Sequence, residues 1–144
     1  MLNDLFNRIW NRVVHSIVRG NPDSTSMNGE TLYESDKPFT AYKTVSCLCD
    51  DKDLWEISIA KLEIPSGTLW IPDHYHSGVI RSEMARVINI DRYDRYIRCM
   101  SSVVANGKVE YKPGTTTYAD KLPRPNNENG IYAYFSEEEL RQQN

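Results

Sequence analysis

The sequence predicts an α+β fold with a mostly antiparallel β-sheet core, an N-terminal amphipathic helix and a short C-terminal helix. Residues 3–19 repeat apolar side chains at helical spacing, and short runs from residue 39 onward alternate apolar with polar side chains. A helix-capping sequence lies near the C-terminus. At 144 residues the chain can bury one hydrophobic core. We therefore expect an oligomerisation helix over 1–20, a linker over 21–37 and a β-rich ligand-binding domain over 38–144.

The N-terminal segment carries an apolar stripe that ends at Gly20 and Pro22. A stripe of this kind packs either on its own subunit or against the same helix of another subunit, and the spacing does not distinguish the two. We expect self-association into a homo-oligomer between a dimer and a hexamer. The residues expected at its interface are Phe6, Ile9, Trp10, Val13 and Ile17.

The first strands are expected on either side of the acidic turn at 50–53. Residues 39–48 alternate apolar and polar side chains, and the same period continues through 55–64 until Pro65. Between these strands and the N-terminal helix, the Asn, Ser, Asp, Gly and Thr content of residues 21–37 is typical of a surface loop.

The second half of the chain predicts a hairpin, a last strand and a helix. Residues 79–90 contain a strand whose best part is 85–90. Asn106-Gly107 separates strands at 96–104 and 108–111, because both residues accept a positive φ in a tight turn. Residues 131–135 form the last strand, and Ser136 with Glu139 forms a capping box for the closing helix.

Charge and composition narrow the function classes. A net charge of -3 and a pI near 5.6 argue against bulk DNA or RNA as a partner, which calls for a basic surface. No apolar run approaches membrane-spanning length, and charged residues interrupt the N-terminal segment, so neither a membrane segment nor a secretory signal is expected. Three cysteines are expected to be free thiols in the cytoplasm.

The sequence offers little sign of catalysis or of metal binding. Residues 73–76, Asp-His-Tyr-His, have the most metal-like spacing, but no second histidine cluster accompanies them, so no metal is expected. We find no nucleophile motif, no phosphate-binding glycine loop and no paired acid motif. A binding protein without a cofactor is therefore expected rather than an enzyme.

Several short segments together resemble a small domain that occurs in viral and phage proteins, both alone and after pentapeptide repeats. They are residues 40–43, 60–65, 81 with 85–87, 111–114 and 130–135. With its N-terminal helix, the chain also resembles the phage anti-Thoeris sponges. That resemblance implies sequestration, without cleavage, of a cyclic ADP-ribose derivative or a cyclic oligonucleotide in the cytoplasm of a bacterial host. An ADP-ribosyl-type enzyme and an adaptor that binds a host protein are the alternatives.

A phosphate-bearing ligand would need guanidinium groups and stacking rings. Five arginines fall between residues 81 and 98, and we expect Arg92 and Arg95 to be solvated because Asp91 and Asp94 interleave with them. Arg124 lies in a loop rich in proline and asparagine, where function is common. The predicted ligand-binding residues are Arg81, Arg86, Arg124, Asn126, Tyr42, Tyr132 and Tyr134.

Overall fold

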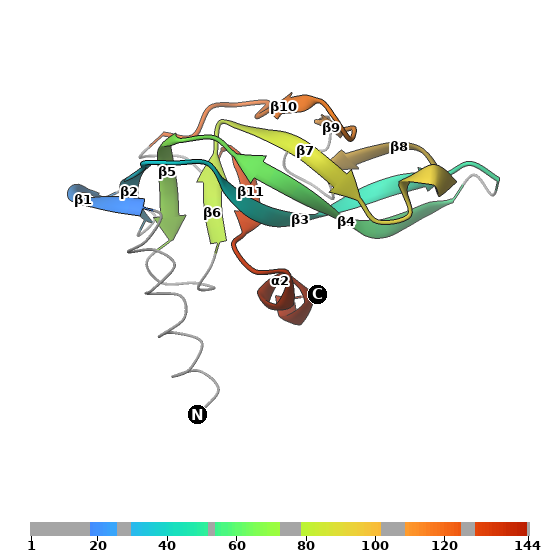
Figure 1. Ribbon diagram of the computed structural model, residues 1–144, viewed down its shortest axis with the longest axis horizontal. Helices are drawn as coiled ribbons and strands as arrows, with labels where there is room; N and C mark the ends of the chain where they lie inside the picture. The colour runs from blue at the N-terminus through green and yellow to red at the C-terminus, as the bar shows by residue number, and fades with distance from the viewer. Residues whose placement is uncertain are drawn as a thin grey trace.

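The computed structural model describes the backbone of residues 18–25, 30–51, 54–72, 79–101, 109–124 and 129–143. These residues form eleven strands, one short 3-10 helix and one α-helix (Figure 1). In chain order the elements are β1 (Val18–Thr25), β2 (Glu30–Ser35), β3 (Phe39–Cys49), β4 (Trp55–Ile64), β5 (Gly67–Pro72), β6 (Val79–Ser82), β7 (Met84–Ile90), η1 (Tyr93–Arg95), β8 (Tyr96–Ser101), β9 (Glu110–Tyr111), β10 (Thr116–Tyr118), β11 (Ile131–Tyr134) and α2 (Glu137–Gln143).

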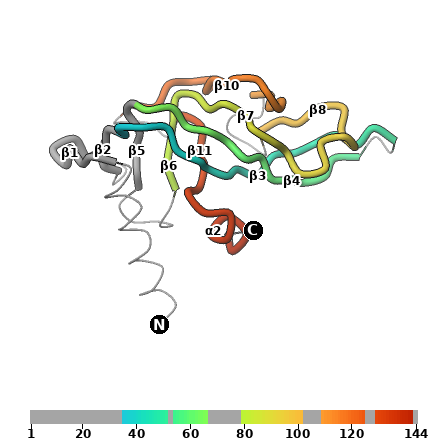
Figure 2. The backbone as a smooth tube through the Cα atoms, in the orientation of Figure 1, coloured from blue at the N-terminus to red at the C-terminus, as the bar shows by residue number. Residues whose placement is uncertain are grey.

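All eleven strands join one antiparallel sheet in the order β1-β2-β5-β6-β11-β3-β4-β7-β10, with β8 added beside β3 and β9 beside β8. Strand β3 pairs with β4 along one side, and with β11 and then β8 along the other. Strands β3 and β4 bend together along the long axis of the molecule (Figure 2). The long β3–β4 pair therefore lies at the centre of the sheet, and β7, β8 and β11 pair with its two sides.

The core lies on one face of this central pair. In β3 the odd-numbered residues are the more buried ones, and in β4 the even-numbered residues from Ser58 to Ile64 are buried. This is the period of two that an extended chain imposes. The main apolar core residues of the two strands are Phe39, Ala41, Val45, Cys47, Cys49, Ala60, Leu62 and Ile64.

The prediction of an α+β fold is wrong for the described residues. Their regular structure is almost entirely antiparallel strand, and α2 is their one α-helix. The linker prediction for 21–37 is also wrong, because β2 pairs with β5 from Glu30 to Ser35 and so belongs to the sheet. The predicted N-terminal helix lies outside the described residues up to 17, but Val18 and Arg19 begin β1 instead of ending a helix.

The two strands of the predicted hairpin pair with each other, whereas nothing tests the predicted turn between them. Strands β8 and β9 pair antiparallel, with Cys99 opposite Tyr111. The turn residues 106–107 lie outside the described residues. A two-residue turn there with uninterrupted strands would set Ser102 opposite Tyr111, so the observed register differs from the simplest hairpin.

The closing helix forms as predicted. The backbone N–H of Glu139 donates to Ser136 Oγ over 3.3 Å, and three glutamates occupy the first turn. This cap satisfies an N–H at the helix start. No helix among the described residues is long and apolar enough to cross a membrane.

The prediction of three free thiols is wrong. Cys47 and Cys99 lie directly opposite each other on β3 and β8 and form a disulfide, whereas Cys49 is free and buried. Both bonded cysteines are fully buried. The disulfide thus joins two strands of the core whose cysteines are 52 residues apart in sequence.

Candidate functional site

A cleft of about 270 Å³ lies where β3, β4, the turn after β7 and α2 come together. Strand β3 contributes Thr44, and β4 contributes three consecutive residues. The turn contributes an acid and an arginine, and α2 contributes a second arginine. The lining residues are Thr44, Ile57, Ser58, Ile59, Asp91, Arg92 and Arg141.

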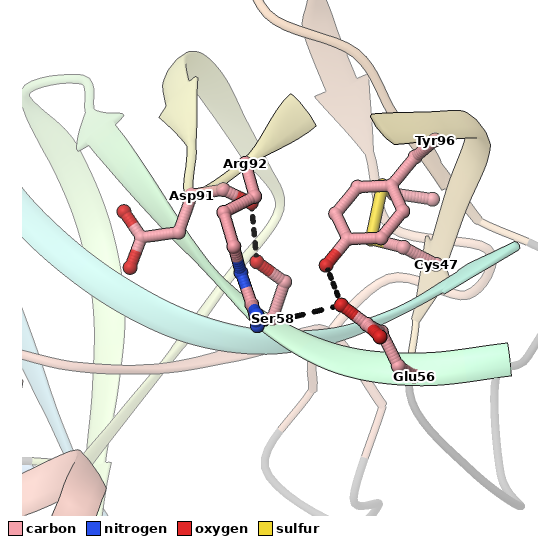
Figure 3. The surroundings of a disulfide bond; sticks show 7 residues. Cys47, Glu56, Ser58, Asp91, Arg92 and Tyr96 are labelled. Atoms are coloured by element: carbon pink, nitrogen blue, oxygen red, sulfur yellow. Dashed lines mark hydrogen bonds and ion pairs between the residues drawn. A yellow bond between two sulfur atoms is a disulfide. The ribbon is translucent and has the colours of Figure 1, made fainter. Parts of the chain in front are cut away.

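Two hydrogen bonds fix the turn after β7 against β4. The backbone N–H of Asp91 donates to the Ile59 carbonyl over 3.0 Å. Ser58 Oγ–H donates to the Asp91 carbonyl over 2.7 Å (Figure 3). Thr44 and Ile59, which also line the cleft, are direct cross-strand partners on β3 and β4. The position of the turn is therefore set by the sheet.

Arg92 adopts an unusual backbone conformation in this turn. Its φ of 58° and ψ of 31° lie in the left-handed region, where it is the one non-glycine residue among those described. A side chain with a Cβ is disfavoured there, and such strained residues cluster at functional sites. The conformation holds the Arg92 side chain beside β4, with its NH2 atom 3.4 Å from Glu56 Oε1.

Glu56 is the centre of a small polar network beside the disulfide. Tyr96 OH donates to Glu56 Oε1 over 2.5 Å, and Arg95 NH1 lies 4.0 Å from the same oxygen (Figure 3 shows the tyrosine). The Tyr96 hydrogen bond lowers the pKa of Glu56, and the charges of Arg95 and Arg92 act in the same direction. Burial, followed by hydrogen bonding to Glu56, raises the pKa of Tyr96. The carboxylate of Glu56 therefore faces the guanidiniums of both Arg92 and Arg95.

Arg141 supplies the second guanidinium of the cleft. Its NH2 atom lies 3.9 Å from Asp91 Oδ2 and 3.6 Å from Glu137 Oε1, and the side chain is more than half exposed. Exposed ion pairs of this kind stabilise a fold by at most about 1 kcal/mol. Both cleft arginines can consequently exchange a carboxylate partner for a ligand at little cost to the fold.

Arg81, a predicted ligand residue, is fully buried. Its NH1 atom donates to the Asn129 carbonyl over 2.7 Å, and its NH2 atom donates to the Arg124 carbonyl over 3.2 Å. The nearby Gly130 has a φ of +113°, and an added Cβ would lie 3.1 Å from Pro123. Arg81 thus fastens the segment before β11 to β6, which is a structural role that the sequence did not suggest.

The other two predicted arginines are exposed and lie apart from the cleft lining. Arg86 Nε donates to Glu63 Oε1 over 3.2 Å across β7 and β4. Arg124 NH1 donates to the Pro123 carbonyl and lies 3.7 Å from Glu83 Oε1. The structure does not bring these two guanidiniums together with Arg81 around one pocket, although Arg124 contacts Arg81 through its backbone.

The predicted tyrosines lie together on the sheet. Tyr42 and Tyr134 are direct cross-strand partners on β3 and β11, and Tyr132 lies opposite Arg81. All three are half-buried. On the opposite face of β3, Lys43 Nζ donates to the Tyr132 carbonyl over 2.9 Å, and burial lowers the pKa of Lys43 to about 8.

Several predicted residues fall outside the described part of the chain. They are Asn126 of the ligand set, the interface residues Phe6, Ile9, Trp10, Val13 and Ile17, and the segment 73–76 that resembles a metal site. Among the described residues, no group of three His, Cys, Asp or Glu side chains is placed to hold a metal ion.

The residues that line the cleft were missed or set aside on sequence grounds. The interleaved Asp91 and Asp94 predict a solvated Arg92, and no sequence pattern singles out Arg141. The Asp91-Arg92 pair at the end of an apolar strand was the available signal, since turns that follow strands often carry functional groups.

Comparison with known proteins places most of these elements in one family. A model described as "Family of unknown function (DUF5758)" matches residues 30–140, from the start of β2 into α2. The chain belongs to this family. No curated protein and no solved structure matches it. The family covers every residue of the cleft except Arg141, which lies one position beyond the match.

Proposed function

We propose that the chain is a binding protein that holds a compact, phosphate-bearing ligand in the cleft and releases it unchanged. The observation that carries this proposal is the pair of guanidiniums, Arg92 and Arg141, which line one cleft from separate elements. Guanidinium groups suit phosphate because they present several N–H donors in a fixed plane. Thr44 and Ser58 line the same cleft, and the Ser58 hydroxyl holds the turn that carries Arg92 through its bond to the Asp91 carbonyl.

The walls of the cleft add an apolar surface. Ile57 and Ile59 lie on the same side of β4, next to the polar groups. Combined apolar and polar lining is typical of small-molecule sites, which usually span about 300 to 1,000 Å³. A volume near 270 Å³ favours a ligand that inserts a phosphate and part of a sugar while its remainder stays outside.

The sequence resemblance supports a more specific form of the proposal. In this form the protein is a phage-encoded sponge that sequesters a cyclic ADP-ribose derivative or a cyclic oligonucleotide in the bacterial cytoplasm, and thereby blocks an immune signal. Such ligands carry two or more phosphates, which two separated guanidiniums can contact at once. The ADP-ribosyl-type enzyme and the host-protein adaptor remain the alternatives.

Calorimetric titration of arginine variants tests the site. We expect Arg92→Gln and Arg141→Gln each to weaken binding of a cyclic ADP-ribose or a cyclic oligoadenylate about tenfold or more, because a charged hydrogen bond contributes about 1.5 to 3 kcal/mol. Arg86→Gln and Arg124→Gln are matched controls, since both arginines are exposed and outside the cleft. Loss of affinity in the controls with normal affinity in the cleft variants would move the site to the arginines predicted from sequence.

Recovery of the ligand distinguishes the three functions. The protein is incubated with each labelled nucleotide, separated from free nucleotide and denatured, and the released compound is analysed by mass spectrometry. Release of intact nucleotide supports the sponge. A changed product would support the enzyme, and absence of retained nucleotide would support the adaptor.

A further inference from the structure

The face of the sheet opposite the core continues beyond the cleft toward the turn after β3. Leu48 lies directly opposite Trp55 on β4 and Arg98 on β8, so these three side chains share one face. Thr44, which lines the cleft, is an even-numbered residue of β3 like Leu48 and lies on the same face. The cleft and this group of side chains therefore belong to one surface of the sheet.

Trp55 is an open aromatic residue beside the cleft. It comes two residues before Ile57, which lines the cleft, and neighbours of this kind on one face of a strand are about 7 Å apart. Trp55 is 51% exposed and Ile57 is 53% exposed. Strands β3 and β4 extend past α2 in this direction (Figure 1). A ligand in the cleft can therefore continue along β4 onto the indole ring.

Arg98 accompanies the Trp55 ring on this surface. Its guanidinium lies over the ring, 5.9 Å from the ring centre, and the residue is exposed. No carboxylate of the described residues forms an ion pair with Arg98. Planar bases stack on aromatic rings and on guanidinium planes, and an exposed contact between the two is weak enough to rearrange around a base. The pair thus offers a stacking surface for a planar aromatic group.

The tyrosines that the sequence predicts to stack a base are less accessible. Tyr42 and Tyr134 are cross-strand partners on β3 and β11, and α2 packs against both strands. Both tyrosines are half-buried, and burial, followed by the charge of Glu139, raises the pKa of Tyr134. Trp55 is therefore the more exposed aromatic residue on this face of the sheet.

We propose that Trp55 and Arg98 form a subsite that stacks the base of a nucleotide whose phosphates lie in the cleft. This inference rests on the proposed function. A cleft of about 270 Å³ takes a phosphate and part of a sugar, so the base lies outside it. Because one sugar separates a base from its phosphate, the neighbouring position along β4 is the place for the base. Every base has a flat face, so stacking at this subsite accepts different bases.

Calorimetric titration with nucleotides and with inorganic pyrophosphate tests the subsite. We expect Trp55→Ala to weaken binding of a cyclic oligoadenylate or a cyclic ADP-ribose about tenfold or more, because it removes the stacked ring. Pyrophosphate has no base, so its affinity should not change. Tyr118→Ala, which removes an exposed aromatic residue on β10, is the matched control and should leave both affinities unchanged. Circular dichroism establishes that each variant is folded.

Tryptophan fluorescence reports on the stacking itself, because a base stacked on an indole ring quenches its emission. Trp55→Phe keeps an aromatic ring, so we expect it to bind the nucleotides within about threefold of the wild type but to lose most of the quenching. Quenching that persists in Trp55→Phe, unchanged nucleotide affinity in Trp55→Ala, or an equal loss for nucleotide and pyrophosphate would overturn the subsite. Nucleotide binding that still requires Arg92 would then leave the proposed function in place, whereas a wild type that binds no nucleotide would overturn both.

Discussion

Removal of the Cys47–Cys99 disulfide is expected to lower the stability of the fold by about 4 kcal/mol. The double variant Cys47→Ala with Cys99→Ala opens a loop whose ends are 52 residues apart in sequence. For a loop of this length, the entropy that a crosslink removes from the unfolded chain corresponds to about 4 kcal/mol at 25 °C. Because both cysteines are fully buried in the core, little else changes at the surface.

Denaturant unfolding followed by tryptophan fluorescence measures this difference. A loss of about 4 kcal/mol corresponds to a fall in melting temperature of roughly 10 to 16 °C for a chain of this size. A dithiol reductant should destabilise the wild type similarly once it reaches the buried bond, and should have no effect on the double variant.

Cys49→Ala provides the matched control. Cys49 is buried on the same strand but is not bonded, so its variant keeps the disulfide and its sensitivity to reductant. If the double variant lost less than about 1 kcal/mol, or if reductant left the wild type unchanged after unfolding and refolding, Cys47 and Cys99 would not form a stabilising crosslink.

Two further substitutions test buried charged groups. Arg81→Ala should lower the free energy of unfolding by about 3 to 5 kcal/mol, because it leaves a cavity and removes the guanidinium that bonds two main-chain carbonyls. A loss below about 1 kcal/mol in denaturant unfolding would contradict the structural role of Arg81. Lys43 has a pKa of about 8 in the folded chain, below its value of 10.5 in the unfolded chain. Between these two pH values the unfolded chain binds more protons than the folded chain, so the free energy of unfolding rises with pH. Lys43→Met should abolish this rise, which can be measured by comparing the melting temperatures of variant and wild type across this pH range. An identical pH dependence in both proteins would contradict the burial of the Lys43 ammonium group.

Strands whose own residues alternate apolar with polar side chains could be predicted from the sequence. Residues 39–48, 55–64 and 131–135 alternate within a single segment, and each forms a strand close to its expected bounds. Residues 30–35 were missed because their polar composition is typical of a loop. That segment is a strand through its pairing with β5, which lies beyond β3 and β4 in the chain, and such pairing is not visible in local composition.

The candidate site was less predictable, because arginines of identical chemistry acquire different roles from burial and register. Arg81 and Arg86 are close in sequence, yet one is fully buried and the other is exposed. Arg141 lines the cleft with Thr44 because α2 packs against β3 and β11. The disulfide likewise depends on the register that sets Cys47 opposite Cys99.

The proposed function requires that Arg92 and Arg141 contact the phosphates of a bound nucleotide. The most direct measurement is the side-chain Nε–H spectrum of ¹⁵N-arginine protein during titration with a cyclic ADP-ribose or a cyclic oligoadenylate, with signals assigned from single arginine-to-lysine variants. We expect the Arg92 and Arg141 signals to shift together and saturate at one site per chain, while the Arg86 and Arg124 signals stay in place. Saturating shifts at Arg86 or Arg124 with none at Arg92 and Arg141, or no shift at any arginine with any of these nucleotides, would contradict it.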